Sequence, residues 1–190
     1  MNHPRRRATL TCLAAGLLTA ALPAVSAAAY PDKPIRLVVP FPPGQGADIL
    51  ARLIGQHLAA ALGQPIVVEN KVGAGGIIGT AFAAKAAPDG YTLYMGSSGP
   101  LAIGPHVYKA VGFDTLKDFA PISNIASVTQ VLVTAPASQL ASAKDVVERA
   151  RAQPGMVPFG SAGSGTTSHL TMGLFTQMSG ISLSHVPYKG

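Results

Sequence analysis

The chain has 190 residues, 48% of them hydrophobic, which is enough to bury a sizeable core. Its 14 Lys and Arg outnumber 8 Asp and Glu, but the basic side chains are scattered singly and are not interleaved with aromatic ones, which excludes a nucleic-acid-binding surface. The single cysteine, Cys12, lies near the N-terminus, so neither disulfides nor thiolate metal sites can hold the rest of the fold together.

Residues 1–29 have the organisation of an export signal. Arg5, Arg6 and Arg7 form a basic region, an apolar stretch follows over residues 10–22, and small residues near Ala27 to Ala29 predict the cleavage site. The apolar stretch is too short for a membrane span, which needs about 20 residues. The arginines leave both the Sec and the Tat export routes open. Removal of this segment lowers the formal net charge from +6 to +3, because it carries three arginines and no acidic residue.

Strands, glycine-rich turns and helices alternate in the first half of the remaining chain. Apolar runs predict the strands, and apolar residues three to four positions apart predict the helices. The expected strands cover residues 35–39, 66–68 and 91–95, and the expected helices cover residues 47–61 and 77–87. Short connections between such elements are typical of a parallel sheet wound by helices, in which the turns that follow the strands meet at one edge.

A long uncharged segment separates this unit from a second one. Residues 119–143 hold no charged side chain but several prolines and polar residues, which favours an extended connector, with one or two extended segments over residues 122–133, over a membrane segment. The elements expected beyond it are a helix over residues 143–153 with Ser142 as its N-cap, a strand over 157–160, a helix over 168–179 and a strand over 181–186. We therefore predict two lobes, residues 30–126 and residues 127–190, the second containing the hinge and only the start of a lobe.

Three glycine-rich turns, over residues 41–48, 96–99 and 160–169, follow predicted strands in corresponding places. The start of a helix offers N–H groups without intrahelical partners and the positive end of the helix dipole, so such turns can receive a small anion. A single turn of this kind is what any tight connection requires, and only the recurrence favours a binding site. The residues expected to bind the ligand are Phe41, Pro42, Gly44, Gln45, Asp48, Ser97, Ser98, Ser161, Gly165, Thr166, Thr167 and His169.

Two of these residues have alternative roles. Asp48 either pairs with an ammonium group of the ligand or caps the first turn of its own helix. His169 either contacts the ligand or is a buried histidine with a hydrogen-bond partner in the protein.

The sequence offers no pattern for catalysis, a cofactor or a metal ion. No Gly-x-Ser-x-Gly motif surrounds any of the serines in the turns, and the glycines over residues 73–79 miss the dinucleotide-binding spacing by one position. The histidines are not at metal-ligand spacing. We therefore expect a binding protein and not an enzyme, without cofactor or metal.

Several motifs together resemble those of one known family, the extracytoplasmic solute-binding receptors of the tripartite tricarboxylate transporters, also called Bug or TctC-like proteins. The resemblance extends over residues 30–190. The matching segments are residues 30–36 (YPDKPIR), 40–44 (PFPPG) with Asp48, 73–76 (GAGG) with Gly79 and Thr80, 88–93 (PDGYTL), Gly165 and Thr166 with 168–170 (SHL), and 186–190 (VPYKG).

This resemblance implies an α/β fold of the two-lobed periplasmic-binding-protein type (type II-like), each lobe a mostly parallel sheet with flanking helices. It implies a periplasmic, monomeric receptor that closes on a small carboxylate, which in the family is a di- or tricarboxylate, an amino acid or an aromatic acid. The loops matching residues 41–48 and 160–169 would hold the carboxylate from opposite lobes, and the receptor would deliver it to a membrane permease. Two alternatives remain open: an exported α/β enzyme that acts on a small carboxylate, and a ligand-sensing subunit of a signalling system.

The sequence departs from the family pattern at three places. Gln45 stands where a second glycine is usual, so an amide side chain can enter the pocket and change ligand preference. Val72 replaces a usual proline in a loop that we expect to be structural. The family continues well beyond the Tyr-Lys-Gly motif at residues 188–190, so the resemblance predicts a chain truncated at its C-terminus, prone to aggregate and a weak binder when expressed alone.

Overall fold

A computed structural model describes residues 29–189 of the chain. The predicted export signal, apart from Ala29, lies outside these residues. All helices and strands among these described residues belong to one compact unit, Lys33–Gly190.

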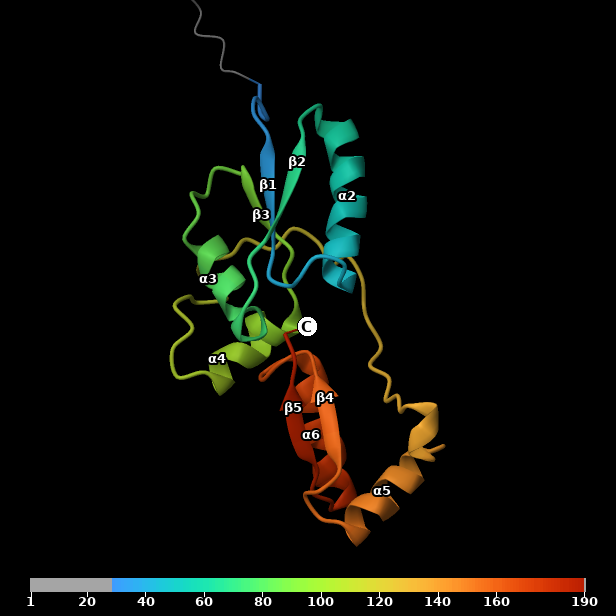
Figure 1. Cartoon of the computed structure of the whole chain (residues 1–190). Coiled ribbons are helices and arrows are strands. Elements are labelled where there is room, and N and C mark those ends of the chain that lie inside the picture. Colours follow the sequence, from blue (N-terminus) through green and yellow to red (C-terminus); the bar gives the residue numbers. More distant parts are fainter. Residues whose placement is uncertain (1–28, 190) are drawn as a thin grey trace, which may run out of the picture. The chain divides into compact units, whose positions relative to one another are not determined.

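The first sheet has three parallel strands in the order β2-β1-β3, which are β2 (Ile66–Asn70), β1 (Ile35–Val39) and β3 (Thr92–Tyr94) (Figure 1). Leu37 pairs with Val68 on one side and with Leu93 on the other. Because β1 is central, four of its five side chains are buried, and only Arg36 is exposed. A nearly continuous apolar run is what a strand covered on both faces requires. The three predicted strands and their parallel arrangement are confirmed.

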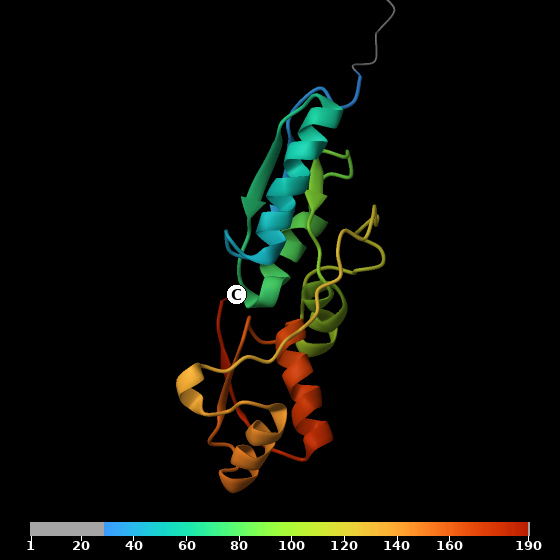
Figure 2. The ribbon, with the colours of Figure 1, turned by 90° about the vertical axis from the view of Figure 1, so that its right-hand side faces the viewer.

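Helices α2 (Gly46–Leu62) and α3 (Ile77–Ala84) cover opposite faces of this sheet (Figures 1 and 2). The strand order explains this placement, because right-handed crossovers that leave β1 and β2 in opposite directions put their helices on opposite sides. Helix α2 ends at Gly63, which adopts the left-handed conformation common after a helix. Helix α3 ends at Ala84 and not at residue 87, because Lys85 and Ala86 donate backbone hydrogen bonds three residues back.

The first core lies between α2 and the sheet. Leu37, Val39, Ala51 and Met95 are buried in one cluster, against which Phe41 and Ile54 pack. After β3 the chain forms a π-helical turn (Gly99–Ile103) that continues into the short helix α4 (Gly104–Val107).

The uncharged connector forms neither helix nor strand over residues 120–135 of the described chain. A short 3₁₀ turn (Pro136–Ser138) then leads to α5 (Ala143–Ala152). The predicted N-cap is confirmed: the Ser142 hydroxyl accepts a hydrogen bond from the Asp145 N–H, and the Asp145 carboxylate accepts one from the Ser142 N–H. This reciprocal pair is a capping box.

The second sheet consists of two parallel strands, β4 (Pro158–Ser161) and β5 (Ser184–Pro187), joined by α6 (Thr167–Ser179). Strand β5 begins three residues later than predicted, because the backbone groups of Ile181 and Ser182 bond to Thr176 and Gly155 instead. Each half of the unit therefore contains a parallel sheet with flanking helices. The lobe boundaries at residues 30–126 and 127–190 stay a prediction.

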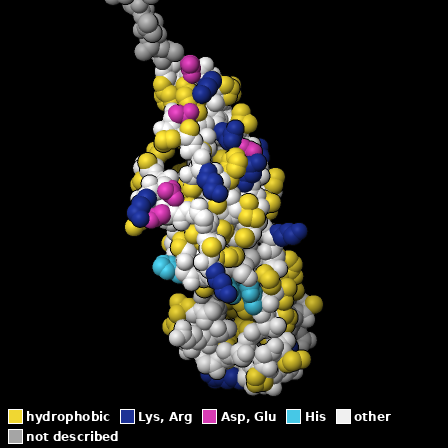
Figure 3. All heavy atoms as spheres, turned by 90° about the vertical axis from the view of Figure 1, so that its left-hand side faces the viewer, with side chains coloured by type: hydrophobic (Ala, Val, Ile, Leu, Met, Phe, Trp, Pro, Cys, Tyr) yellow, Lys and Arg dark blue, Asp and Glu magenta, His cyan; other side chains and the backbone are white. Residues whose placement is uncertain are grey.

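No helix among the described residues is long and apolar enough to cross a membrane. On the face shown in Figure 3, Lys and Arg side chains are interspersed with Asp and Glu side chains and with hydrophobic ones.

Candidate functional site

A cavity of about 290 Å³ lies where the two sheets' turns approach each other. We call it the glycine-lined cavity, because much of its wall is glycine backbone. Its lining residues are Pro40, Phe41, Val72, Gly73, Ala74, Gly75, Gly76, Tyr108, Ala162, Gly163, Ser164, Pro187, Tyr188 and Lys189. Residues of the first and of the third predicted turn thus line the same cavity.

The predicted site residues divide into three groups around this cavity. Phe41 lines it directly. Ser161 and Gly165 flank the lining residues 162–164. The remaining ones, which do not line the cavity, are Pro42, Gly44, Gln45, Asp48, Ser97, Ser98, Thr166, Thr167 and His169.

Residues 73–76, which the sequence analysis treated as structural, form part of the cavity wall. Gly75 has φ +62°, and a Cβ atom there would lie 2.6 Å from the Ser164 carbonyl oxygen. The close approach of this loop to the third turn therefore requires glycine at position 75. The available signal was the glycine cluster after the apolar strand β2, the same signal that identified the other turns.

Tyr108 is a second cavity residue that the sequence analysis missed. Its hydroxyl donates a hydrogen bond to the Ser164 carbonyl oxygen at 2.8 Å. Its ring lies so close to Gly165 that a Cβ there would be 3.0 Å from Tyr108 Cε2. The second turn also reaches the third, because the Ser98 and Thr167 hydroxyls share a 3.0 Å hydrogen bond. Nothing in the irregular segment around Tyr108 marks this role in sequence.

The Asp48 carboxylate is buried and is surrounded by donors from its own chain. Its Oδ2 accepts hydrogen bonds from Gly44 N and Arg52 Nε, both at 2.9 Å, and its Oδ1 accepts one from Asn70 Nδ2 at 2.9 Å. The hydrogen bond from Arg52, with those from Gly44 and Asn70, holds the pKa of this carboxyl well below its ordinary value. Of the two predicted roles of Asp48, these contacts favour stabilisation of the first turn of its own helix over pairing with an ammonium group of the ligand.

Asn70 extends this network to the first turn. Its side-chain amide also donates to the Phe41 carbonyl oxygen at 2.9 Å. Asn70 at the end of β2 and Asp48 at the start of α2 therefore act together to hold the backbone of Phe41, which lines the cavity.

The third turn is closed by hydrogen bonds within itself. Thr166 Oγ1 donates to the Gly163 carbonyl oxygen at 2.6 Å, and the Ala162 and Gly163 N–H groups donate to Ser168 Oγ and Ser161 Oγ. Ser161 and Thr166 are buried. Several polar groups expected to face a ligand thus shape the turn, which presents its backbone to the cavity.

His169 has its hydrogen-bond partner within the protein, as one of the two predicted roles requires. Its Nδ1 accepts a hydrogen bond from Gly165 N at 3.2 Å. Its ring stacks on that of His185, with centroids 4.0 Å apart, and the Phe159 ring stacks on His185 at 4.9 Å and lies 6.5 Å from His169. His185 Nε2 shares a 2.6 Å hydrogen bond with Ser161 Oγ. Burial and the neighbouring His185 lower the pKa of His169.

Two helices that start at these turns lack a cap from the N-cap side chain. Neither Gln45 before α2 nor Thr166 before α6 accepts a hydrogen bond from the first turn with its side chain. Helix α5, outside the site, has a full capping box. The N-terminal N–H groups of α2 and α6 therefore keep capacity for an external acceptor, which the helix dipole makes favourable for an anion.

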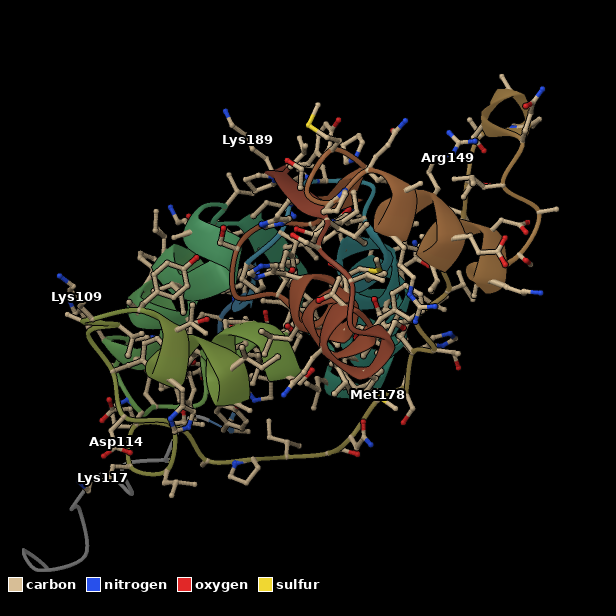
Figure 4. All side chains as sticks on the ribbon, turned by 90° about the horizontal axis from the view of Figure 1, so that it is seen from below. Lys109, Asp114, Lys117, Arg149, Met178 and Lys189 are labelled. Atoms are coloured by element: carbon tan, nitrogen blue, oxygen red, sulfur yellow. The ribbon has the colours of Figure 1, made fainter. Side chains whose placement is uncertain are left out.

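The charged side chain among the described residues that line the cavity is that of Lys189. It projects away from the ribbon in Figure 4, at the rim of the site. Among residues 29–189 no group of His, Cys, Asp or Glu could hold a metal ion. The chemistry available at the cavity is thus hydrogen bonding to a small polar or anionic ligand.

Comparison with known proteins identifies relatives of this chain. The family model described as "Tripartite tricarboxylate transporter family receptor" matches residues 50–190. The protein BugT of Bordetella pertussis is 43% identical over 167 residues, which are 87% of this chain and 51% of that protein. A protein encoded in the tcbD-tcbE intergenic region of Pseudomonas sp. is 38% identical over 97% of this chain and 55% of its own length.

Solved structures share the fold. A periplasmic transporter with 40% identity superposes with a TM-score of 0.75, over 85% of this chain and 54% of its own. A protein of R. palustris solved with adipate has 37% identity and a TM-score of 0.81 over the same shares of the two chains. The periplasmic binding protein BugD has 30% identity and a TM-score of 0.70. The predicted periplasmic-binding-protein fold is confirmed.

The chain spans about half the length of the curated relatives it matches. The family model nevertheless covers well over half of this chain, and it includes most of α2, all later elements through β5 and the second and third turns, but not the first turn at residues 41–48. On this evidence the chain belongs to the receptor family of the tripartite tricarboxylate transporters.

Proposed function

We propose that this chain forms the first lobe and part of the second lobe of a receptor that captures a small carboxylate between its two lobes. The observation that supports this proposal is the glycine-lined cavity, which is lined both by Phe41 of the first turn and by residues 162–164 of the third turn. At about 290 Å³ it lies at the lower end of the range of ligand pockets, which suits a ligand of a few carbon atoms.

A carboxylate fits the chemistry of this wall. Charge-assisted hydrogen bonds from N–H groups and hydroxyls stabilise a carboxylate by about 1.5 to 3 kcal/mol each, so an arginine is not needed. The backbone groups of residues 73–76 and 162–164 line the cavity, whereas the uncapped starts of α2 and α6 follow the turns but lie outside its lining. We propose that the ligand contacts the backbone of residues 73–76 and 162–164, together with the predicted residues Phe41, Ser161 and Gly165.

The relatives support a dicarboxylate as the first ligand to test. One structural relative was solved with adipate, and another, MatC of Rhodopseudomonas palustris with 28% identity and a TM-score of 0.73, was solved with bound malate. Both compounds carry two carboxylates. Lys189 at the rim is suited to attract the second one.

We further propose that the receptor works in the periplasm, as a monomer without cofactor, and delivers its ligand to the permease subunits of a tripartite transporter. The family description and the predicted export signal support this setting.

An enzymatic function has one observation in its favour, the 2.6 Å hydrogen bond between Ser161 Oγ and His185 Nε2. A serine nucleophile needs a base that is itself oriented by a third group, and an exposed position for attack. Here the ring of His185 stacks against both Phe159 and His169, and Ser161 is only 7% exposed. The pair therefore fits a role in shaping the third turn better than catalysis.

The proposal is tested by thermal unfolding of the protein without its export signal, in the presence of adipate, malate or the neutral diamide of adipate. A ligand at 100 times its Kd stabilises the folded state by about 2.7 kcal/mol, which raises the Tm of a domain of this size by roughly 5 to 10 °C. We expect a Tm increase that grows with the concentration of a dicarboxylate and is absent with the diamide. A cooperative transition that no carboxylate shifts would contradict the proposal.

A further inference from the structure

Three helices of this chain share one device at their first turn. The third residue of the helix turns its side chain back and accepts a hydrogen bond from the N–H group just before the N-cap. Asp48 accepts from Gly44 at 2.9 Å in α2, Asp145 accepts from Ala141 at 2.9 Å in α5, and His169 accepts from Gly165 at 3.2 Å in α6. The acceptor is a carboxylate in two of them and an imidazole in the third.

An imidazole can act as this acceptor only while the nitrogen concerned carries no proton. The donor is a backbone N–H, so the direction of the bond is fixed and Nδ1 of His169 must be the unprotonated nitrogen. A carboxylate loses its acceptor capacity only in strong acid, whereas histidine gains a proton between pH 5 and pH 8. The start of α6 therefore differs from the starts of α2 and α5 in being sensitive to mild acid.

The surroundings of His169 give a protonated ring no compensating charge. Helix α6, strands β4 and β5 and residues 162–166 carry no ionisable side chain other than His169 and His185. Those two rings stack with centroids 4.0 Å apart and planes 11° apart, so two positive charges there would repel each other. The basic residues that flank these elements in sequence are Arg151 on α5, which donates to the Ser179 carbonyl oxygen of α6, and Lys189 after β5, and neither brings a negative charge to the ring.

The same environment lowers the pKa of His169 from the ordinary 6.5, chiefly through burial and secondly through His185. The unfolded chain therefore takes up a proton at a higher pH than the folded chain does. By linkage the folded state loses stability as the pH falls below 6.5, and the arrangement is favoured above it.

We propose that His169 is a positioning residue for the third turn, and that the turn keeps its ligand-binding shape only while the His169 ring is neutral, which makes carboxylate capture dependent on pH. The consequence for capture rests on the function proposed above. The dependence of the turn itself on His169 does not. His169 acts through the Gly165 N–H, which orients the backbone of residues 162–165 at the cavity wall.

The first experiment follows the backbone N–H of Gly165 by NMR in the ligand-free protein between pH 7.5 and pH 5. We expect its chemical shift and its protection from hydrogen exchange to change with a midpoint below 6.5, together with the ring signals of His169. The H169N variant supplies a side-chain oxygen that accepts from the same N–H without titrating. We expect it to remove the pH dependence, and H169A to lose the protection of Gly165 at every pH.

The second experiment measures the affinity for adipate over the same pH range. For the unmodified chain we expect a several-fold weaker affinity at pH 5 than at pH 7.5, below the limit of about 30-fold for an imidazole of unshifted pKa. H169N should flatten this dependence and bind better than H169A. H106N removes a histidine on α4, outside the third turn, and should leave the dependence unchanged.

The outcomes separate the two proposals. A Gly165 N–H that does not respond to pH, or an H169N variant with the pH dependence of the unmodified chain, would overturn the role of His169. A response of Gly165 without binding of any carboxylate at pH 7.5 would support that role and contradict the receptor function.

Discussion

Asp48 shows how a residue of a family motif can serve the site without facing it. Its two carboxylate oxygens accept three hydrogen bonds, from Gly44, Arg52 and Asn70, and Asn70 in turn holds the Phe41 carbonyl. The side chain of Asp48 is buried within this network. Its contribution to binding is therefore expected to be indirect, through the backbone of the first turn.

We predict that D48N destabilises the protein. The side-chain amide of asparagine would place N–H donors against either the Gly44 and Arg52 donors or the Asn70 donor, which costs about 1 to 3 kcal/mol. Thermal unfolding at pH 7 should show a Tm lower by roughly 2 to 4 °C per kcal/mol. The contribution of Asp48 is present above its ordinary pKa of 3.8 and is lost as the pH falls below it, so the two proteins should converge in acid.

D114N is the matched control for this prediction. Asp114 pairs with Lys117 at 2.9 Å but is 45% exposed, and exposed ion pairs contribute about 1 kcal/mol or less. Equal Tm losses in D48N and D114N would contradict the importance of burial for the Asp48 network.

We predict that G75A is more destabilising than G63A. Both glycines have the left-handed conformation, at φ +62° and +69°, in which an alanine costs about 1 to 2 kcal/mol. A Cβ at position 75 would lie 2.6 Å from the Ser164 carbonyl oxygen, whereas one at position 63 meets no atom within 4 Å. Denaturant unfolding should show an additional loss of about 1 kcal/mol or more for G75A. Similar losses in both variants would mean that the loop and the third turn are not in contact in solution.

At the scale of elements, the contrast between helix starts distinguishes structural from binding roles. Helix α5 is closed by Ser142 and Asp145, whereas the N-cap side chains of α2 and α6 leave their first turns open. The two open helices are those that follow the turns at the cavity. A helix that is fully capped by its own side chains has little to offer an external anion.

We predict that S142A destabilises the protein by about 1 kcal/mol, the usual effect of removing an N-cap side chain. The loss should be local, so hydrogen exchange measured by mass spectrometry should increase in Ala143–Ala152 more than in α2. S123A is the control, because the Ser123 hydroxyl only donates to the adjacent Asn124 carbonyl. Unchanged exchange in α5 of S142A would show that the capping box does not stabilise this helix.

At the scale of the whole molecule, the second sheet leaves apolar surface uncovered. An open hollow of about 690 Å³ lies between the connector, α5, β4 and α6, and it is lined by apolar side chains such as Val131, Val146 and Phe175. On α6, Leu174 is 57% and Met178 is 79% exposed. Met178, at the end of α6, is labelled in Figure 4. Exposed apolar surface of this kind promotes association.

We predict that the 190-residue chain, prepared alone, self-associates at micromolar concentrations, as sedimentation velocity or light scattering would show. A double variant with L174K and M178K should associate less. L116K removes a side chain that is 91% exposed elsewhere and should have little effect. A chain that stays monomeric at these concentrations would contradict this prediction.

The sequence by itself determined the elements and their order. Within residues 29–189, apolar runs, helix periodicity and glycine or serine at the helix ends predicted the five strands, the four longer helices and the Ser142 cap, because these features depend on neighbours within a few positions. The resemblance of its motifs predicted the family and the parallel two-sheet fold.

Only the tertiary structure decided which turn residues face the cavity. The roles of Asp48, Thr166 and His169 within their own turns depend on hydrogen bonds whose directions no local pattern fixes. The roles of Gly75 and Tyr108 depend on contacts with Ser164 across more than 50 positions of sequence. Such contacts arise only when turns that belong to the two separate sheets meet, so they became visible only in the folded chain.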